Sequence, residues 1–117
     1  MSRREVCFII GSQGAVLACD LSGSPVSMAD TRSRWEMIWA LRAEVEEIVH
    51  SHPLGPDDFS TEDLTTMVAL DAALGRKLRY SVVSPACVVV RENGHRVEPS
   101  EPEPWWVPLL RAASGMS

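Results

Sequence analysis

The chain has 117 residues, of which 45% are apolar and 23% are charged, and its formal net charge is −5 at pH 7. This length and apolar content favour one domain with a hydrophobic core of its own. The eleven lysines and arginines are scattered along an acidic chain, which excludes the clustered basic footprint of a nucleic-acid-binding protein. No apolar run reaches membrane-spanning length, and the N-terminus lacks the apolar core of a signal peptide. We therefore expect no nucleic acid and no membrane as partners.

The cysteines indicate a reducing compartment. Cys7, Cys19 and Cys87 are odd in number, far apart in the sequence and embedded in apolar stretches, and no C-x-x-C pair is present. This pattern is typical of small buried cysteines with free thiols rather than of a disulfide framework. We expect a cytoplasmic protein.

The N-terminal region predicts a β-hairpin. Two apolar runs, at 6–10 and 15–19, flank the Gly-Ser-Gln-Gly turn sequence at 11–14. A short extended piece is expected to follow at 26–28.

A helix is expected at 34–44. Ser33 and Glu36 have the spacing of a capping box, and the following apolar residues recur at helical spacing. We expect Trp35 and Trp39 to face the core.

The centre of the chain predicts a strand followed by a helix. The strand is expected at 46–52 and carries His50 and His52 two residues apart, so both imidazoles lie on one face. An amphipathic helix then begins at Thr61, and Gly75 is well placed as its C-cap.

The C-terminal part begins with two predicted strands, at 79–83 and 86–91, and a turn at Asn93-Gly94. The acidic and proline-rich stretch at 98–104 favours an extended, solvated segment. The apolar tail that follows, with Trp105-Trp106, is expected to dock on the domain or on a partner protein, since exposed tryptophan pairs promote aggregation.

Together these elements predict an α/β (α+β) fold, with a mixed sheet flanked by helices. We assign residues 1–95 to one domain and residues 96–117 to a Pro/Glu-rich segment with a tryptophan-containing tail.

One motif stands out for its chemistry. His50-Ser51-His52-Pro53 is followed after six residues by Ser60, and three residues later by Asp63. Two imidazoles and one carboxylate are a ligand set of catalytic zinc, which keeps a fourth position open. Taken alone, two histidines at this spacing are more often solvated or half-buried than metal-bound, and Ser60 with Asp63 can be a capping box.

The pattern H-x-H-P, six residues, S-x-x-D resembles the signature of the JAMM (JAB/MPN-type) zinc metalloproteases, in particular their prokaryotic branch. Members of this family cleave isopeptide or peptide bonds at the C-termini of ubiquitin and ubiquitin-like proteins. The resemblance implies a curved mixed sheet with a cytidine-deaminase-like core. It also implies Zn²⁺ held by His50, His52 and Asp63, and Ser60 as a stabiliser of the oxyanion.

The family also needs a glutamate as general base, placed just before an apolar strand that ends in glycine. Glu5, before the run that ends at Gly11, resembles that setting and is the residue the resemblance implies. Family members generally have glycines three and seven residues after this glutamate, whereas Phe8 stands at the first place and Gly11 comes six residues on. Other acidic residues near the motif are Glu36, Glu44, Glu46 and Glu47; of these, Glu46 lies about 13 Å from His50 along an extended strand.

Three functions therefore stay open. The first is a zinc-dependent isopeptidase or peptidase, deubiquitinase-like, acting on the C-terminal tail of a ubiquitin-like or sulfur-carrier-like protein. The second is a non-catalytic MPN-like binding module that keeps the fold, with or without the metal. The third is a hydrolase of small molecules or peptidoglycan peptides that uses the same zinc site. A homo-oligomer, or a partner protein covering the N-terminal edge, is also left open.

Overall fold

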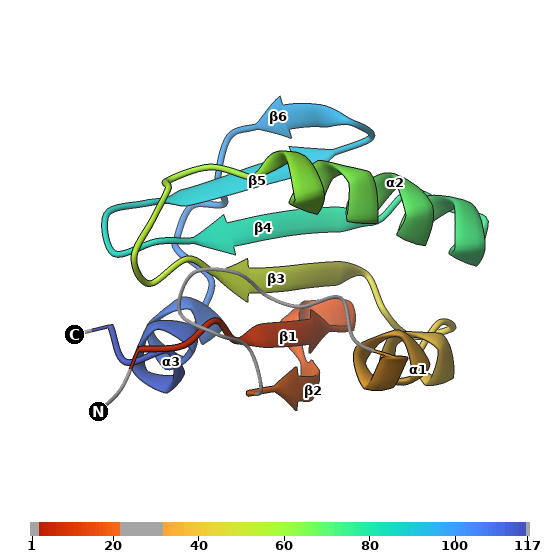
Figure 1. Cartoon of the computed structure of the whole chain (residues 1–117), viewed down its shortest axis with the longest axis horizontal. Coiled ribbons are helices and arrows are strands. Elements are labelled where there is room, and N and C mark those ends of the chain that lie inside the picture. Colours follow the sequence, from red (N-terminus) through yellow and green to blue (C-terminus); the bar gives the residue numbers. More distant parts are fainter. Residues whose placement is uncertain (1–2, 22–31, 117) are drawn as a thin grey trace.

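The computed structural model describes residues 3–21 and 32–116 (Figure 1). The extended piece expected at 26–28 lies outside these residues. The strands are β1 (Cys7–Ile10), β2 (Val16–Asp20), β3 (Glu47–Ser51), β4 (Arg79–Val83), β5 (Val88–Glu92) and β6 (His95–Val97). The helices are α1 (Arg32–Ala40), α2 (Thr61–Leu74) and α3 (Trp106–Ala113), with a short 3₁₀ turn, η1 (Ser12–Gly14).

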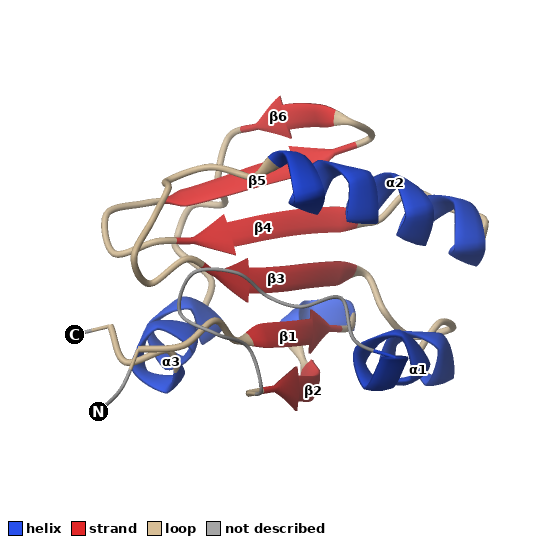
Figure 2. Cartoon of the chain, viewed as in Figure 1, coloured by secondary structure: helices blue, strands red, loops and turns tan. Residues whose placement is uncertain are grey.

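Within the described residues, six strands form one mixed sheet in the order β2-β1-β3-β4-β5-β6, which confirms the predicted α+β class (Figure 2). Only the β3–β4 pair among them is parallel, and the other neighbours are antiparallel. A parallel pair needs a crossover connection, and α2 supplies it. No helix in the described ranges is both long and apolar enough to cross a membrane.

Helices α1 and α2 cover one face of the sheet. Ile38 of α1 and Leu70 of α2 pack with Cys7, Ile9 and Ile48 on the strands. These strand residues share one face because successive side chains alternate along a strand. The two histidines, at positions 50 and 52, have the same parity as Ile48 and therefore lie on this helix-covered face.

Helix α3 covers the opposite face. Trp106, Val107 and Leu110 are buried in one cluster with Phe8 of β1 and with Val6, the residue before this strand. The sequence pattern did not predict α3 or strand β6. The expected docking of the tail is confirmed for Trp106, which is 2% exposed, whereas its neighbour Trp105 stays 60% exposed.

The predicted limits of α1 were wrong. The helix begins at Arg32 and ends at Ala40, so Ser33 lies inside it and is not its N-cap. Trp35 packs against the core as expected, but Trp39 is 52% exposed and lies under the guanidinium of Arg42, 4.3 Å from the ring centre. Amphipathic spacing marks a face of a helix, and Trp39 lies at the solvent edge of that face.

The cysteine prediction holds only in part. Cys7 is buried, as expected, whereas Cys19 is exposed and Cys87 is partly exposed. Cys19 lies on β2, an edge strand of the described sheet, where a neighbouring strand covers only one side.

Helix α2 begins and ends as predicted. Its first turn follows Ser60, and Gly75 adopts the left-handed conformation, with φ of 71°, that ends many helices. Asp71, in the last turn, accepts hydrogen bonds from the Leu78 amide at 3.0 Å and from the Tyr80 hydroxyl at 2.7 Å. These contacts fix the end of α2 to the start of β4.

The burial of Trp106 predicts a large loss of stability when it is truncated. Trp106→Ala should lower the free energy of unfolding by about 3–5 kcal/mol, because it leaves a cavity beneath α3. Trp39→Ala is the matched control and should cost about 1 kcal/mol or less, since it removes a half-exposed cation–π contact. Urea unfolding followed by circular dichroism measures both. Equal losses in the two variants would contradict the packing of α3.

Candidate metal centre

His50 lies on β3, and His52 follows directly after the last residue of this strand. Cys7 of β1 is the cross-strand partner of His50, which places the histidine strand next to the N-terminal strand. The imidazole Nε2 atoms of His50 and His52 lie 3.1 Å apart. The two rings therefore converge at one point, at the C-terminal end of the strand, as the period of two predicted.

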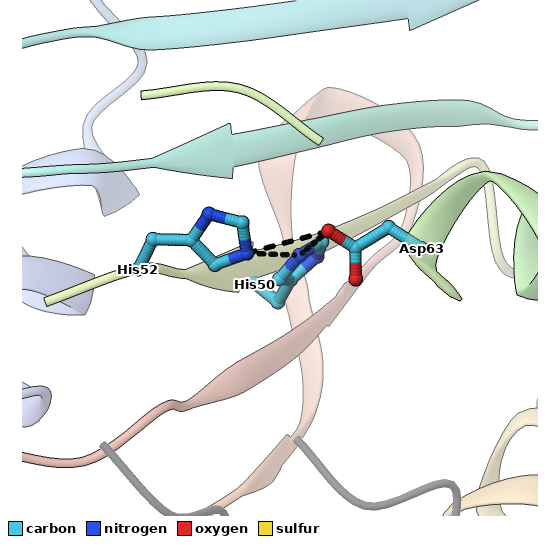
Figure 3. Close-up of side chains that lie close together, drawn as sticks. All are labelled: His50, His52 and Asp63. Carbon is cyan, nitrogen blue, oxygen red and sulfur yellow. Dashed lines mark hydrogen bonds and ion pairs between the residues drawn. The ribbon is translucent and has the colours of Figure 1, made fainter. Parts of the chain in front are cut away.

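Asp63 reaches the histidines from the first turn of α2 (Figure 3). Its Oδ2 lies 3.2 Å from Nε2 of His50 and 3.3 Å from Nε2 of His52. The capping box expected at Ser60 is also present, because the Ser60 amide donates to Oδ2 of Asp63 at 2.8 Å and the Asp63 amide donates to Oγ of Ser60 at 3.0 Å. The capping interpretation of Ser60 and Asp63 is therefore confirmed, and the cap leaves Asp63 facing the histidines.

Burial and these contacts shift the pKa values of Asp63 and His52. Burial alone raises the pKa of the Asp63 carboxyl, but hydrogen bonds from His50 and His52 outweigh it and hold that pKa well below its usual range. For His52, burial lowers the pKa, whereas hydrogen bonds with Asp63 and with the backbone carbonyl of Pro56 produce a net rise. The site thus favours an ionised carboxylate beside the imidazoles.

The tautomer of His52 is fixed by a backbone group. Its Nδ1 lies 2.9 Å from the carbonyl oxygen of Pro56, which can only accept a hydrogen bond. Nδ1 must therefore carry a proton, so in the neutral ring the lone pair lies on Nε2 and points to the centre of the site. A ligating histidine commonly has such a partner on its other nitrogen.

The spacing of the three atoms fits a bound cation. Two ligands about 2.0–2.1 Å from a tetrahedral zinc ion lie about 3.3–3.4 Å from each other. The distances among the three atoms are 3.1, 3.2 and 3.3 Å. His50, His52 and Asp63 form a group that could hold a metal ion.

Glu5 lies beside the histidine pair. Its Oε1 is 3.5 Å from Nε2 of His52, and the residue is only 3% exposed. Within the described part of the chain, Oε2 of Glu5 is buried and has no hydrogen-bond partner. Burial raises the pKa of Glu5 to about 7, although the positive charge of His52 opposes the rise. A carboxyl group of this kind can exchange a proton near neutral pH.

The backbone on both sides of Glu5 is held by distant residues. The Arg4 amide donates to the carbonyl of Ser114 at 3.0 Å, and the Val6 amide donates to Oγ of Ser51 at 2.9 Å. The Ser114 hydroxyl in turn donates to Oγ of Ser51 at 2.5 Å. Sequence reasoning missed these serines, because a serine between two histidines and another near the C-terminus carry no pattern that links them.

The other glutamates are placed away from the site. Glu36, Glu44 and Glu46 are exposed. Glu47 is buried but lies on the opposite face of β3 from His50, where it accepts a hydrogen bond from Ser81 at 2.5 Å. Glu5 is thus the glutamate that the fold brings to the histidines.

Cys7 shares the face of the histidines, but burial raises the pKa of its thiol to about 12, which keeps the thiol protonated.

No protein-family model matches the chain, and no curated protein matches it significantly. A function for this chain is therefore inferred from the motif and from the geometry of the site.

The convergence of the three ligand atoms predicts metal binding at one site per chain. Purified protein should retain about one zinc ion, and His52→Ala should lose stoichiometric binding because the set falls to two ligands. His95→Ala is the matched control, since His95 is exposed on β6, and it should bind zinc fully. Elemental analysis of dialysed protein measures the content of zinc, iron and other metals. Full occupancy in His52→Ala, or iron in place of zinc, would contradict the prediction.

Proposed function

We propose that this protein is a zinc-dependent hydrolase of the JAMM type, which cleaves an amide bond at the C-terminal tail of a ubiquitin-like or sulfur-carrier-like protein. One observation carries the proposal: Glu5, a buried carboxylate, lies within 3.5 Å of a ligand atom in the His50, His52 and Asp63 group. The motif resembles the JAMM signature, and the closeness of these four residues supports the proposal.

The three ligands would hold the ion and leave room for the substrate. When bound, zinc supplies Lewis-acid chemistry that activates water and polarises a carbonyl group. His50 and Asp63 are partly exposed, with side-chain exposures of 14% and 19%, so a substrate can approach from their side. His52 is buried, and its ring is oriented by the Pro56 carbonyl.

Glu5 is the general base in this proposal. It accepts a proton from the attacking water and returns it to the amine that leaves. Its burial suits this role, because a carboxylate kept out of solvent is a stronger base than an exposed one. The hydrogen bonds from the amides of Arg4 and Val6 to Ser114 and Ser51 hold the backbone on either side of Glu5.

Ser60 has a hydroxyl that can stabilise the oxyanion. Its Oγ accepts a hydrogen bond from the Asp63 amide, which leaves its own proton available to donate. Because Ser60 caps α2, the hydroxyl is held close to the ligand Asp63. A preorganised donor of this kind stabilises charge that develops on a carbonyl oxygen.

Ser60→Ala tests this role. It removes a helix cap, so stability should fall by about 1 kcal/mol, and it removes an oxyanion donor, so the rate should fall by about 10²-fold. Zinc content should stay near one per chain. Ser60→Thr is the control, because threonine keeps both the cap and the hydroxyl, and it should recover most of the rate. Unchanged turnover in Ser60→Ala would remove Ser60 from the mechanism.

Glu5→Gln tests the base directly. Glutamine has nearly the same shape but cannot accept the proton, so zinc and fold should be retained while the rate falls at least about 10²-fold. The measurement is cleavage of a panel of ubiquitin-like fusions, together with zinc analysis. Glu62→Gln is the matched control, since Glu62 is an exposed residue beside the ligand Asp63, and its rate should not change.

Two outcomes would contradict the proposal in different ways. If Glu5→Gln cleaves as fast as the wild-type protein, the base lies elsewhere. If the wild-type protein holds zinc but cleaves no tail even at high enzyme concentration, the binding-module hypothesis replaces the hydrolase.

A further inference from the structure

The candidate base lies just outside the regular sheet. The β1–β3 ladder begins with the pair Cys7 and His50. Glu5 and Val6 precede β1, where one further backbone bond, from the Ser51 amide to the Val6 carbonyl at 3.0 Å, continues the pairing. The place of Glu5 beside the histidines therefore depends on what holds the chain at this end of the ladder.

The hydroxyl of Ser51 supplies the next contact. In a regular antiparallel ladder, two opposed residues exchange two N–H···O=C bonds. Here the second bond, from the Val6 amide, goes to the side-chain Oγ of Ser51 at 2.9 Å. Ser51 lies between His50 and His52 in the sequence, so its side chain points to the opposite face of the sheet. A side chain behind the strand thus sets how closely Glu5 approaches the ligands in front of it.

The C-terminal segment holds this hydroxyl in place. The Ser114 hydroxyl donates to Oγ of Ser51 at 2.5 Å, and the Ser114 carbonyl accepts from the Arg4 amide at 3.0 Å. Both serines are completely buried, and Ser114 directly follows α3. Ser114 therefore connects the residues on both sides of Glu5 to the end of α3, Arg4 directly and Val6 through Ser51.

These hydrogen bonds fix a geometry that packing alone does not. An alanine side chain would fill almost the same space as serine, but it cannot accept a hydrogen bond from the Val6 amide. A buried amide without an acceptor is costly, so the chain would move to find one. Such a movement would shift the peptide that joins Val6 to Glu5. A displacement of about 1 Å in a reacting group can lower a rate by about 10²-fold.

We propose that Ser51 and Ser114 are positioning residues, which hold the Glu5 carboxylate at its working distance from His52. The inference rests on the proposed function. Neither hydroxyl touches the candidate metal centre, because both lie on the α3 face of the sheet. The rate of the reaction should therefore depend on the two serines, whereas zinc content and substrate binding should not.

Ser51→Ala tests the positioning role by kinetics. The kcat for tail cleavage should fall about tenfold or more, while KM changes less than about twofold and zinc stays near one per chain. Ser81→Ala is the matched control, because Ser81 is a buried serine on the same face whose hydroxyl bonds Glu47 and not the segment around Glu5. Its kcat should not change. An unchanged kcat in Ser51→Ala, or an equal fall in Ser81→Ala, would overturn the proposal.

Ser114→Ala tests the second link. Oγ of Ser51 would still accept the Val6 amide, so the protein should fold even if Ser51→Ala does not, and kcat should fall by about three- to tenfold. Because the two serines act in one chain of hydrogen bonds, the double variant should be no slower than Ser51→Ala alone. An unchanged kcat in Ser114→Ala, or effects that multiply in the double variant, would overturn the proposal.

Amide hydrogen exchange tests the connection without catalysis. In zinc-loaded protein, the Val6 amide should exchange at least about tenfold faster in Ser51→Ala than in the wild type, because its acceptor is gone. The Phe8 amide lies within the β1–β3 ladder and should not change. Ser81→Ala should leave both amides unchanged. Equal exchange of Val6 in Ser51→Ala and the wild type would show that the hydroxyl does not hold this segment, and would overturn the proposal.

The two proposals fail in different ways. If the wild-type protein and Ser51→Ala cleave tails equally fast, the positioning role is removed and the hydrolase remains. If the wild-type protein cleaves no tail, the hydrolase is removed, and with it the role of Glu5 as a base. The exchange of the Val6 amide would then still decide whether the serines hold the segment that carries Glu5.

Discussion

The carboxylate of Asp63 connects the parts of this structure on which the site depends. One oxygen, Oδ2, accepts a hydrogen bond from the Ser60 amide at 2.8 Å and lies within 3.3 Å of the Nε2 atoms of both imidazoles. The same residue thus caps α2 and fixes the start of that helix to the end of β3. A cation held by these three atoms would satisfy the polar atoms that converge here, which burial beside an apolar core otherwise makes costly.

The sheet topology places this interaction where ligands are commonly found. The parallel pair β3–β4 requires α2 as its crossover, and a ligand site forms where a strand ends and such a connection begins. β1 is the antiparallel neighbour of β3, and Glu5, just before β1, therefore lies beside His52. Helix α3, whose Trp106 is buried, covers the opposite face. Ser114, which follows this helix, accepts a hydrogen bond from the amide of Arg4, the residue before Glu5. The C-terminal segment is therefore part of the structure that holds the candidate base.

Local features of the fold could be predicted because they depend on neighbours in the sequence. The strand period placed His50 and His52 on one face, the three-residue spacing gave the cap that orients Asp63, and Gly75 ended α2 in the left-handed conformation. The prediction of α1 was less accurate, because apolar spacing locates the buried face of a helix but not the solvent edge of that face, where Trp39 lies. The sheet class also followed, because its strands were separated by clear turn signals.

By itself, the sequence determined that His50, His52 and Asp63 form one group that could hold a metal ion, since strand period and helix capping act over a few residues. Only the tertiary structure decided what lies around that set. The pairing of β1 with β3 brings Glu5 next to His52 across 47 positions of sequence, and the docking of α3 brings in Ser114. The carbonyl that fixes the His52 tautomer belongs to Pro56, and a backbone acceptor leaves no trace in residue type. Contacts of this kind arise from the packing of whole elements, which no short pattern encodes.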